Sequence, residues 1–162
     1  MRIIGLDVGS KTIGVAVSDD LQLCAHAVRT LARRGTKADV AQVLVLCKQY
    51  QTQVAVVGLP LHYDGEGEDM KEGHRASRVR VFGDALAAAG VTVHYHDESY
   101  STVAAQEVLL EADLSRSRRK EVVDRLAAAV ILQAYMDRES RSGSAVDARE
   151  SRTEKATEEP AR

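Results

Sequence analysis

The stretch that decides the fold of this chain is residues 1–18, MRIIGLDVGSKTIGVAVS. It holds two apolar runs separated by a turn of small and polar residues, and this pattern predicts a β-hairpin. Asp7 stands where the first run ends. An ionised carboxylate inside an apolar strand is costly unless something pairs with it. A metal ion, a buried arginine or a set of backbone N–H groups could each be that partner, so the search for chemistry begins at Asp7.

The length and bulk composition indicate one soluble globular domain. The chain has 162 residues, 44% of them hydrophobic and 28% charged, and a formal net charge of −2, so nucleic-acid binding must depend on local clusters of charge. Cys24 and Cys47 are too few and too far apart for a zinc motif, and they are typical of reduced thiols in a cytoplasmic protein. Met1 leads directly into the first predicted strand, so we expect no signal peptide. No apolar run approaches the roughly 18 residues that a membrane helix needs.

The rest of the chain alternates between strands and helices. After the hairpin, the patterns predict a strand over 22–29, a helix over 36–50, a strand over 54–58, a polar loop over 62–73, a helix over 75–89, a strand over 91–96 and helices over 101–112 and 118–138. This order predicts an α/β fold with a mixed five-stranded sheet and helices on both faces. Residues 139–162 hold one large aliphatic residue, Val146, and many charges, so we expect a disordered tail after a domain that spans residues 1–138.

Acidic residues stand at the ends or inside three of these elements. Asp7 ends the first strand, Asp97 and Glu98 follow the last strand, and Asp124 lies within the final helix. Carboxylate oxygens are the ligands that Mg²⁺ and Mn²⁺ prefer, and two such ions about 3.5–4 Å apart stabilise the attacking and leaving oxygens of phosphodiester hydrolysis. The acids therefore predict a metal site. Taken singly, each has a structural alternative: Asp124 could pair with Lys120 one helical turn away, and Asp97 could be a turn residue.

Five sequence blocks carry a resemblance to a known family. They are IGLDVGSKTIGVAVSD at 4–19, VVGLPL at 56–61 with Asp-Gly at 64–65, RVRVF at 78–82, Asp-Glu at 97–98 with Ser-Thr at 101–102, and RKEVVDRLAAAVILQ at 119–133. In this order the chain, over about residues 1–137, resembles the YqgF family of Holliday junction resolvases, also called RuvX-like. The resemblance implies an RNase H-like fold similar to that of the resolvase RuvC, and a metal-dependent nuclease. Bacterial members are implicated in the 5′-end maturation of 16S rRNA, a step of ribosome biogenesis.

The resemblance also assigns the acids. It implies that Asp7, Glu98 and Asp124 are the catalytic residues and the metal ligands, and it favours Glu98 over Asp97. Two positions depart from the family pattern: a basic residue usually follows the lysine of the first turn, where this chain has Thr12, and an arginine usually follows the Asp-Glu pair, where it has Ser99. Both departures remove cations that could hold a phosphate. Substrate binding is therefore either weaker or depends on cations at other positions.

Basic residues near the acids are the candidates for binding the substrate. Lys11 lies in the first turn, Arg75 and Arg78 share a helical face, and a basic cluster begins the final helix, where positive charge opposes the helix dipole. An ordinary solvated surface is the alternative for each. The predicted set is Lys11, Arg78, Arg118, Arg119 and Lys120. Aromatic residues are scarce, which favours recognition of backbone and shape over base stacking. His94 and His96 share one side of a strand, but no third soft ligand accompanies them.

Four functions are compatible with these observations to different degrees. The first is a nuclease acting on structured RNA, with precursor 16S rRNA as substrate and ribosomal precursor particles as partners. The second is a resolvase of four-way DNA junctions, which a dimer would favour; the sequence allows a monomer or a homodimer. The third, an ATPase of the actin or sugar-kinase type, needs two such domains where this chain has room for one. The fourth is a non-catalytic RNA-binding assembly factor.

Overall fold

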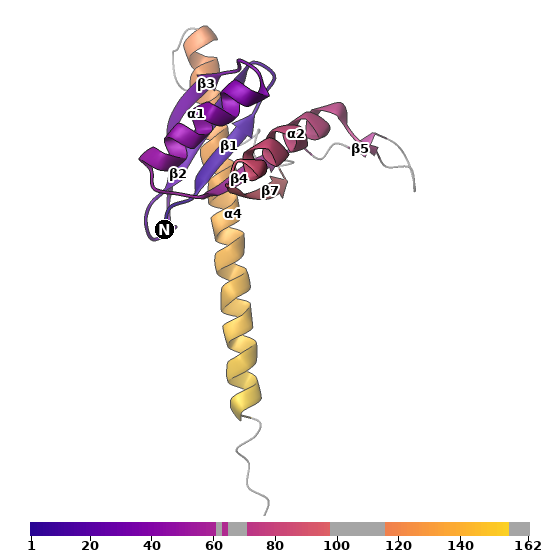
Figure 1. The fold of residues 1–162 in the computed structure, drawn as a ribbon. Coiled ribbons are helices and arrows are strands. Elements are labelled where there is room, and N and C mark those ends of the chain that lie inside the picture. The colour runs from indigo at the N-terminus through magenta and orange to yellow at the C-terminus, as the bar shows by residue number, and fades with distance from the viewer. Residues whose placement is uncertain (61–62, 65–70, 98–115, 156–162) are drawn as a thin grey trace, which may run out of the picture.

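The computed structural model describes residues 1–60, 63–64, 71–97 and 116–155, and the side chains of residues 1–60, 73–97 and 122–142 (Figure 1). Its elements, in chain order, are β1 (Ile4–Val8), β2 (Thr12–Ser18), β3 (Ala25–Ala32), α1 (Thr36–Gln49), β4 (Val54–Leu59), β5 (Tyr63–Asp64), β6 (Lys71–Glu72), α2 (His74–Ala88), β7 (Thr92–Asp97) and α4 (Arg116–Lys155).

Five of the strands form a mixed sheet in the order β3-β2-β1-β4-β7. The short turn after β1 returns the chain as the antiparallel β2, and β3 continues this meander. The longer crossovers through α1 and α2 bring in β4 and β7 parallel to β1 and β4. Parallel neighbours need such crossovers, whereas antiparallel ones need only a tight turn. The predicted mixed five-stranded sheet is therefore confirmed.

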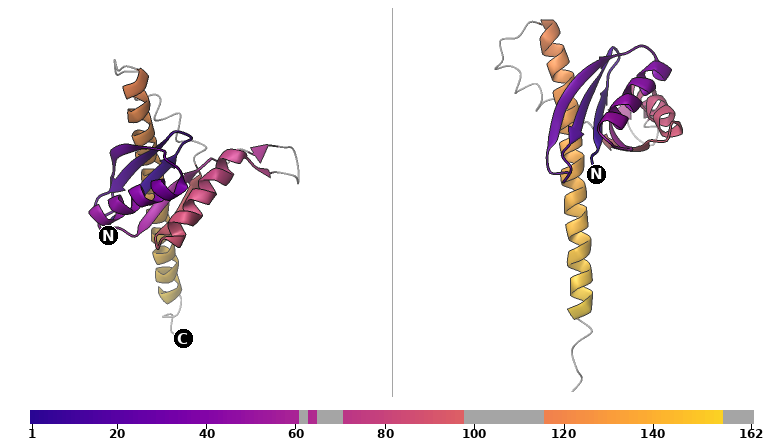
Figure 2. Two further views of the ribbon diagram at one scale, coloured as in Figure 1. Left: turned by 45° about the horizontal axis from the view of Figure 1, so that its top comes forward. Right: turned by 60° about the vertical axis from the view of Figure 1, so that its left-hand side comes forward.

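Helices cover both faces of the sheet (Figures 1 and 2). Alternate strand residues such as Leu6, Val15 and Val57 pack against α1 and α2 in the larger core. The residues between them, such as Ile3 and Ala16, pack against α4 in a smaller core. Because side chains alternate across a strand, residues 5 and 7 of β1, residue 3 just before it, and residues 12, 14 and 16 of β2 all face α4.

Glycines allow α4 to approach the sheet closely. A Cβ atom added at Gly14 would lie 1.8 Å from the backbone oxygen of Asp124, and one added at Gly5 would lie 2.7 Å from Cβ of Leu132. Farther along α4, the side-chain amide of Gln133 donates to the Leu23 carbonyl and accepts from the Ala25 backbone N–H. Helix α4 therefore packs closely against the central strands β1 and β2 and is hydrogen-bonded to the chain at the start of the edge strand β3.

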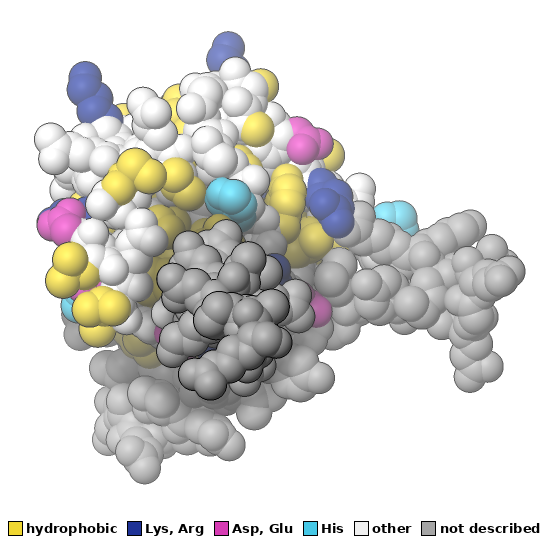
Figure 3. Space-filling model, turned by 90° about the horizontal axis from the view of Figure 1, so that it is seen from below, with side chains coloured by type: hydrophobic (Ala, Val, Ile, Leu, Met, Phe, Trp, Pro, Cys, Tyr) yellow, Lys and Arg dark blue, Asp and Glu magenta, His cyan; other side chains and the backbone are white. Residues whose placement is uncertain are grey.

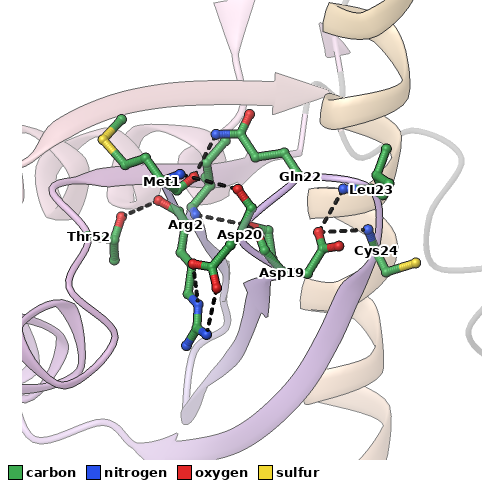
Figure 4. Close-up of polar contacts among 10 residues, drawn as sticks. Met1, Arg2, Asp19, Asp20, Gln22, Leu23, Cys24 and Thr52 are labelled. Atoms are coloured by element: carbon green, nitrogen blue, oxygen red, sulfur yellow. Dashed lines mark hydrogen bonds and ion pairs between the residues drawn. The ribbon is translucent and has the colours of Figure 1, made fainter.

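The end of the sheet at which β1 begins is closed by polar contacts (Figure 4). Arg2 forms an ion pair with Asp20 at 3.1 Å, and the Thr52 hydroxyl donates to the Arg2 carbonyl. The Asp19 carboxylate accepts the backbone N–H groups of residues 23 and 24, and the bond from Cys24 is the main cause of its lowered pKa. Seen from this side, the described charged side chains are scattered rather than gathered (Figure 3).

Two segments differ from the sequence prediction. The polar loop over 62–73 contains a short antiparallel pair, β5 with β6. The final helix does not end near Arg138 but continues to Lys155, where the composition predicts a disordered tail. Arg, Glu, Ala and Ser are compatible with a helix, and no proline interrupts the chain before Pro160. The described side chains from Asp137 to Ser142 are exposed, so they add nothing to the core.

None of the described helices combines the length and the apolar character that a membrane-spanning segment needs. The helix predicted over 101–112 lies outside the described residues.

Candidate active site

Two of the predicted acids lie on the same face of the sheet. Asp7 is half-buried near the end of β1, and its partner across the antiparallel pair is Gly14 of β2. Gly14 in turn contacts the backbone of α4 at Asp124. Residues 117 positions apart in the chain, Asp7 and Asp124, are therefore brought to one place, because a strand pair and a closely packed helix meet there.

The third predicted acid, Glu98, lies outside the described residues, but its neighbour Asp97 does not. In β7, Val93 and Tyr95 pack against the α1 and α2 core, while His94 and His96 contact Tyr135 of α4. Alternation along the strand puts Asp97 on the α1 and α2 side. Asp97 is thus on the opposite face from Asp7 and Asp124, which supports the preference for Glu98.

A short hydrogen bond reaches Asp124 from the first turn. The Thr12 hydroxyl donates to Oδ2 of Asp124 at 2.6 Å, and both side chains are partly buried. This distance is in the range of charge-assisted O–H···O⁻ bonds. The residue that replaces the family's usual cation therefore contacts one of the predicted catalytic acids.

The turn between β1 and β2 is held from its other side by Arg33. The Arg33 guanidinium donates to the Gly9 carbonyl at 2.8 Å and forms an ion pair at 2.6 Å with Asp39, whose carboxylate is fully buried. The backbone N–H of Arg33 also donates to the carbonyl of Lys11. An ion pair and backbone hydrogen bonds thus fix the turn that carries Lys11 and Thr12.

A cavity of about 910 Å³ lies beside this turn. The turn itself, the segment before α1, the first turns of α2 and the start of α4 line it. Its charged or titratable lining side chains are Lys11, Arg33, His74, Arg75, Arg78 and Asp124. Among the described side chains that line the cavity, basic groups outnumber acidic ones, and this charge suits an anionic chain such as a phosphodiester backbone.

The structure brings together some of the predicted substrate-binding residues. Lys11 and Arg78 both line the cavity, and Arg75 accompanies Arg78 on the same face of α2. Arg80 faces elsewhere, with its guanidinium 5.2 Å from the centre of the Tyr95 ring. Sequence reasoning missed Arg33, because its place in the cavity depends on a buried partner six residues away, and no local pattern marks that partner as buried.

The basic cluster at 118–120 begins α4, ahead of Asp124. The positions of Arg118, Arg119 and Lys120 are therefore at the same end of α4 as Asp124, while their side chains lie outside the described part of the molecule. Their proposed role in substrate binding stays a prediction.

The histidine pair of β7 packs against α4. The rings of His94 and His96 lie 5.6 Å and 6.3 Å from that of Tyr135. Burial lowers the pKa of His96, and the nearby Arg138 adds to this effect. Both histidines are thus engaged by an aromatic ring, and among the described residues no group of three His, Cys, Asp or Glu side chains gathers to hold a metal.

The chemistry of the described donors nevertheless fits a hard cation. Asp7 and Asp124 supply carboxylate oxygens from a rigid strand and a rigid helix on one face of the sheet. Mg²⁺ and Mn²⁺ take oxygen ligands, and Mg²⁺ commonly takes only one or two protein carboxylates. With Glu98 as the predicted third ligand, the donor set would be made of oxygen alone.

An α/β domain with this strand order and with helices on both faces of the sheet (Figure 2) has an RNase H-like fold. The RuvX family model, described as Holliday junction resolvase, matches residues 1–138, and the chain belongs to this family.

Named relatives are similar over most of the chain. A protein of Myxococcus xanthus named "Putative pre-16S rRNA nuclease" is 50% identical over 138 residues, which are 85% of this chain and 88% of that protein. One of the same name from Moorella thermoacetica is 49% identical over 144 residues, 88% of this chain and 99% of that protein. Among solved structures, T. thermophilus RuvC in complex with a Holliday junction substrate has a TM-score of 0.50 at 20% identity, covering 84% of this chain and 96% of that one, which shows the shared fold.

Proposed function

We propose that this protein is a metal-dependent endonuclease that hydrolyses phosphodiester bonds in precursor 16S rRNA during maturation of its 5′ end. The observation that carries the proposal is the basic cavity that opens beside Asp124, in a chain about half identical to relatives named for this activity. Ribosomal precursor particles are the proposed partners, and the cytoplasm is the proposed location.

The basic side chains of the cavity bind and orient the substrate. The Lys11 ammonium is a flexible point charge in the turn between β1 and β2, and it contacts a phosphate close to the acids. Arg75 and Arg78, from the first turns of α2, hold phosphates of the same strand farther along the cavity. Phosphate contacts position a nucleic acid without reading its bases, so specificity comes from the shape of the RNA.

The acids hold the metal. Asp7 and Asp124, with Glu98, supply the oxygen ligands for Mg²⁺ or Mn²⁺. When bound, the ions supply Lewis-acid stabilisation of the attacking and leaving oxygens in the hydrolysis. Gly14 keeps the backbone of α4 against β2, which preserves the separation of Asp7 and Asp124.

The test is cleavage of a labelled precursor 16S fragment, beside a four-way DNA junction, with Mg²⁺ or Mn²⁺. Wild-type protein is compared with Asp7→Asn, and with Asp20→Asn as a matched control, because Asp20 is exposed in an ion pair at the other end of the sheet. We expect RNA cleavage by wild type and Asp20→Asn, and none by Asp7→Asn with an unchanged circular dichroism spectrum. Normal cleavage by Asp7→Asn would remove the metal-site proposal.

The family description gives a second candidate, the resolution of four-way DNA junctions. The same acids and the same cavity would serve it. Cleavage of the junction alone would establish this activity instead. Binding of RNA without cleavage of either substrate would favour a non-catalytic assembly factor.

A further inference from the structure

We infer that Thr12 is a positioning residue for Asp124: its hydroxyl orients this carboxylate for a divalent cation and leaves the negative charge of the carboxylate intact. The inference rests on the proposed function, because it assigns Asp124 a metal. It concerns the position at which this chain departs from its family's usual cation.

Thr12 donates a short hydrogen bond to the carboxylate of Asp124. Oγ1 of Thr12 lies 2.6 Å from Oδ2 of Asp124 in a partly buried setting. A hydroxyl has one proton to donate, whereas an ionised carboxylate only accepts, so the direction of this bond is settled. The bond restrains rotation of the carboxylate and thereby determines where its second oxygen lies.

Both ends of this hydrogen bond are fixed by the surrounding structure. Thr12 is the first residue of β2, and the turn before it is held by the Arg33 contacts to Gly9 and Lys11. Asp124 stands at the point where α4 touches the backbone of Gly14. A β-branched side chain has few χ1 rotamers, so the hydroxyl is placed with little loss of side-chain freedom. Thr12 can therefore hold Asp124 in one orientation.

The Thr12 hydroxyl also leaves the charge of the Asp124 carboxylate unchanged. A lysine or arginine at position 12 would bring a full positive charge close to Asp124, whereas Thr12 brings one hydroxyl proton. A neutral hydroxyl donates a hydrogen bond but adds no charge, so the full attraction for a divalent cation remains. Residues that hold metal ligands in place in this way typically change metal affinity or activity about 10–100-fold when they are removed.

The experiment compares variants at position 12 by two measurements. Binding of Mn²⁺ alone is measured by isothermal titration calorimetry, and cleavage of the precursor fragment is measured to give kcat and KM. Thr12→Val removes the hydroxyl and keeps the shape, and Thr12→Ser keeps the hydroxyl. Thr92→Val is the matched control, since Thr92 is an exposed strand residue on β7, which is not a neighbour of β2 in the sheet.

For Thr12→Val we expect Mn²⁺ affinity and kcat to fall about 10–100-fold, with KM for the RNA within about twofold of wild type. Thr12→Ser should stay within about threefold of wild type for both quantities, and Thr92→Val should be unchanged. Wild-type Mn²⁺ affinity in folded Thr12→Val would overturn the inference. If Thr12→Val does not fold, Thr12→Ala takes its place in the same comparison.

The variant Asp124→Asn distinguishes a failure of the proposed role of Thr12 from a failure of the proposed metal site. Loss of both Mn²⁺ binding and cleavage in Asp124→Asn, with neither affected in Thr12→Val, would refute the role of Thr12 and leave the proposed function standing. Wild-type Mn²⁺ binding and cleavage in Asp124→Asn would refute the metal site and, with it, this inference.

Discussion

Replacing Gly14 with alanine should separate the acids of the site without removing either of them. The new Cβ would lie 1.8 Å from the backbone oxygen of Asp124 and 2.4 Å from its carbonyl carbon. The backbone of a helix cannot relieve this clash by a local rotation, as the end of a flexible side chain could. To bring the first contact to 3.0 Å, α4 or β2 must move by about 1.2 Å, and the movement falls at the residue that carries the carboxylate.

The size of the effect follows from this displacement. A misplacement of about 1 Å in a catalytic arrangement can cost on the order of 100-fold in rate. That factor corresponds to about 2.7 kcal/mol of transition-state stabilisation, at about 1.36 kcal/mol for each factor of ten. Overpacking of this kind also destabilises a fold by about 1–3 kcal/mol. We therefore expect Gly14→Ala to fold, to melt at a lower temperature and to cleave about 100-fold more slowly.

The assay is kcat at saturating nucleic acid and fixed Mg²⁺, together with a thermal melt. Gly83→Ala is the matched control, because its Cβ would lie 2.1 Å from the Tyr95 hydroxyl, on the opposite face of the sheet from Asp7 and Asp124. It should lower the melting temperature and leave kcat within about threefold, far less than the loss expected from displaced acids. Gly5→Ala meets Cβ of Leu132 at 2.7 Å and should fall between these two variants. A kcat for Gly14→Ala within twofold of wild type, or an equal loss in Gly83→Ala, would refute the reasoning.

Three further predictions test other parts of the site. Arg33→Ala removes the cation beside the fully buried Asp39 and should lower the free energy of unfolding in urea by about 3–5 kcal/mol, with part of it restored when Asp39→Asn is added; a loss below about 1 kcal/mol would contradict the role of this ion pair. Lys11→Ala should reduce the slope of log binding constant against log salt by about 1 without changing the melting temperature, and an unchanged slope would place Lys11 outside the interface. In the native protein a thiol reagent should label the exposed Cys24 rapidly and Cys47 only on unfolding, because Cys47 is buried and its burial raises its pKa; two fast thiols would show that the core opens readily.

Much of the fold follows from local patterns in the chain. The hairpin of residues 1–18, the helix of α1 and the buried strand β4 are each marked by the spacing of their own apolar residues, and the structure confirms these elements. The short pair β5 and β6 carries no such pattern, since two residues a side are too few to show a period. The continuation of α4 is hard to predict for a related reason: beyond residue 138 its one large aliphatic residue is Val146, so no apolar face marks a helix in the sequence.

The site was less predictable than the fold because its contacts are not local. Asp7 could be singled out, since an acid in an apolar strand is conspicuous by itself. The contact of Thr12 with Asp124 joins residues 112 positions apart, and the sequence shows Thr12 only as a lost cation. Arg33 gave no signal at all, because an arginine before a helix is ordinary until Asp39 is known to be buried. The packing of the helices on the sheet determines which polar groups meet at this site, and local sequence patterns do not show that packing.

The charge of the cavity also differs from what the composition of the chain indicates. The chain has a net charge of −2, yet four basic side chains from three separate segments line the cavity beside Asp124. A surface that is acidic on average repels a polyanion at long range, but screening limits this repulsion to about 10 Å at 0.1 M salt. Within that distance the local cluster of Lys11, Arg33, Arg75 and Arg78 dominates, although the Arg33 charge is largely balanced by Asp39. The cations absent at Thr12 and Ser99 therefore do not leave the cavity without positive charge, because Lys11 in the turn and Arg75 and Arg78 of α2 supply it.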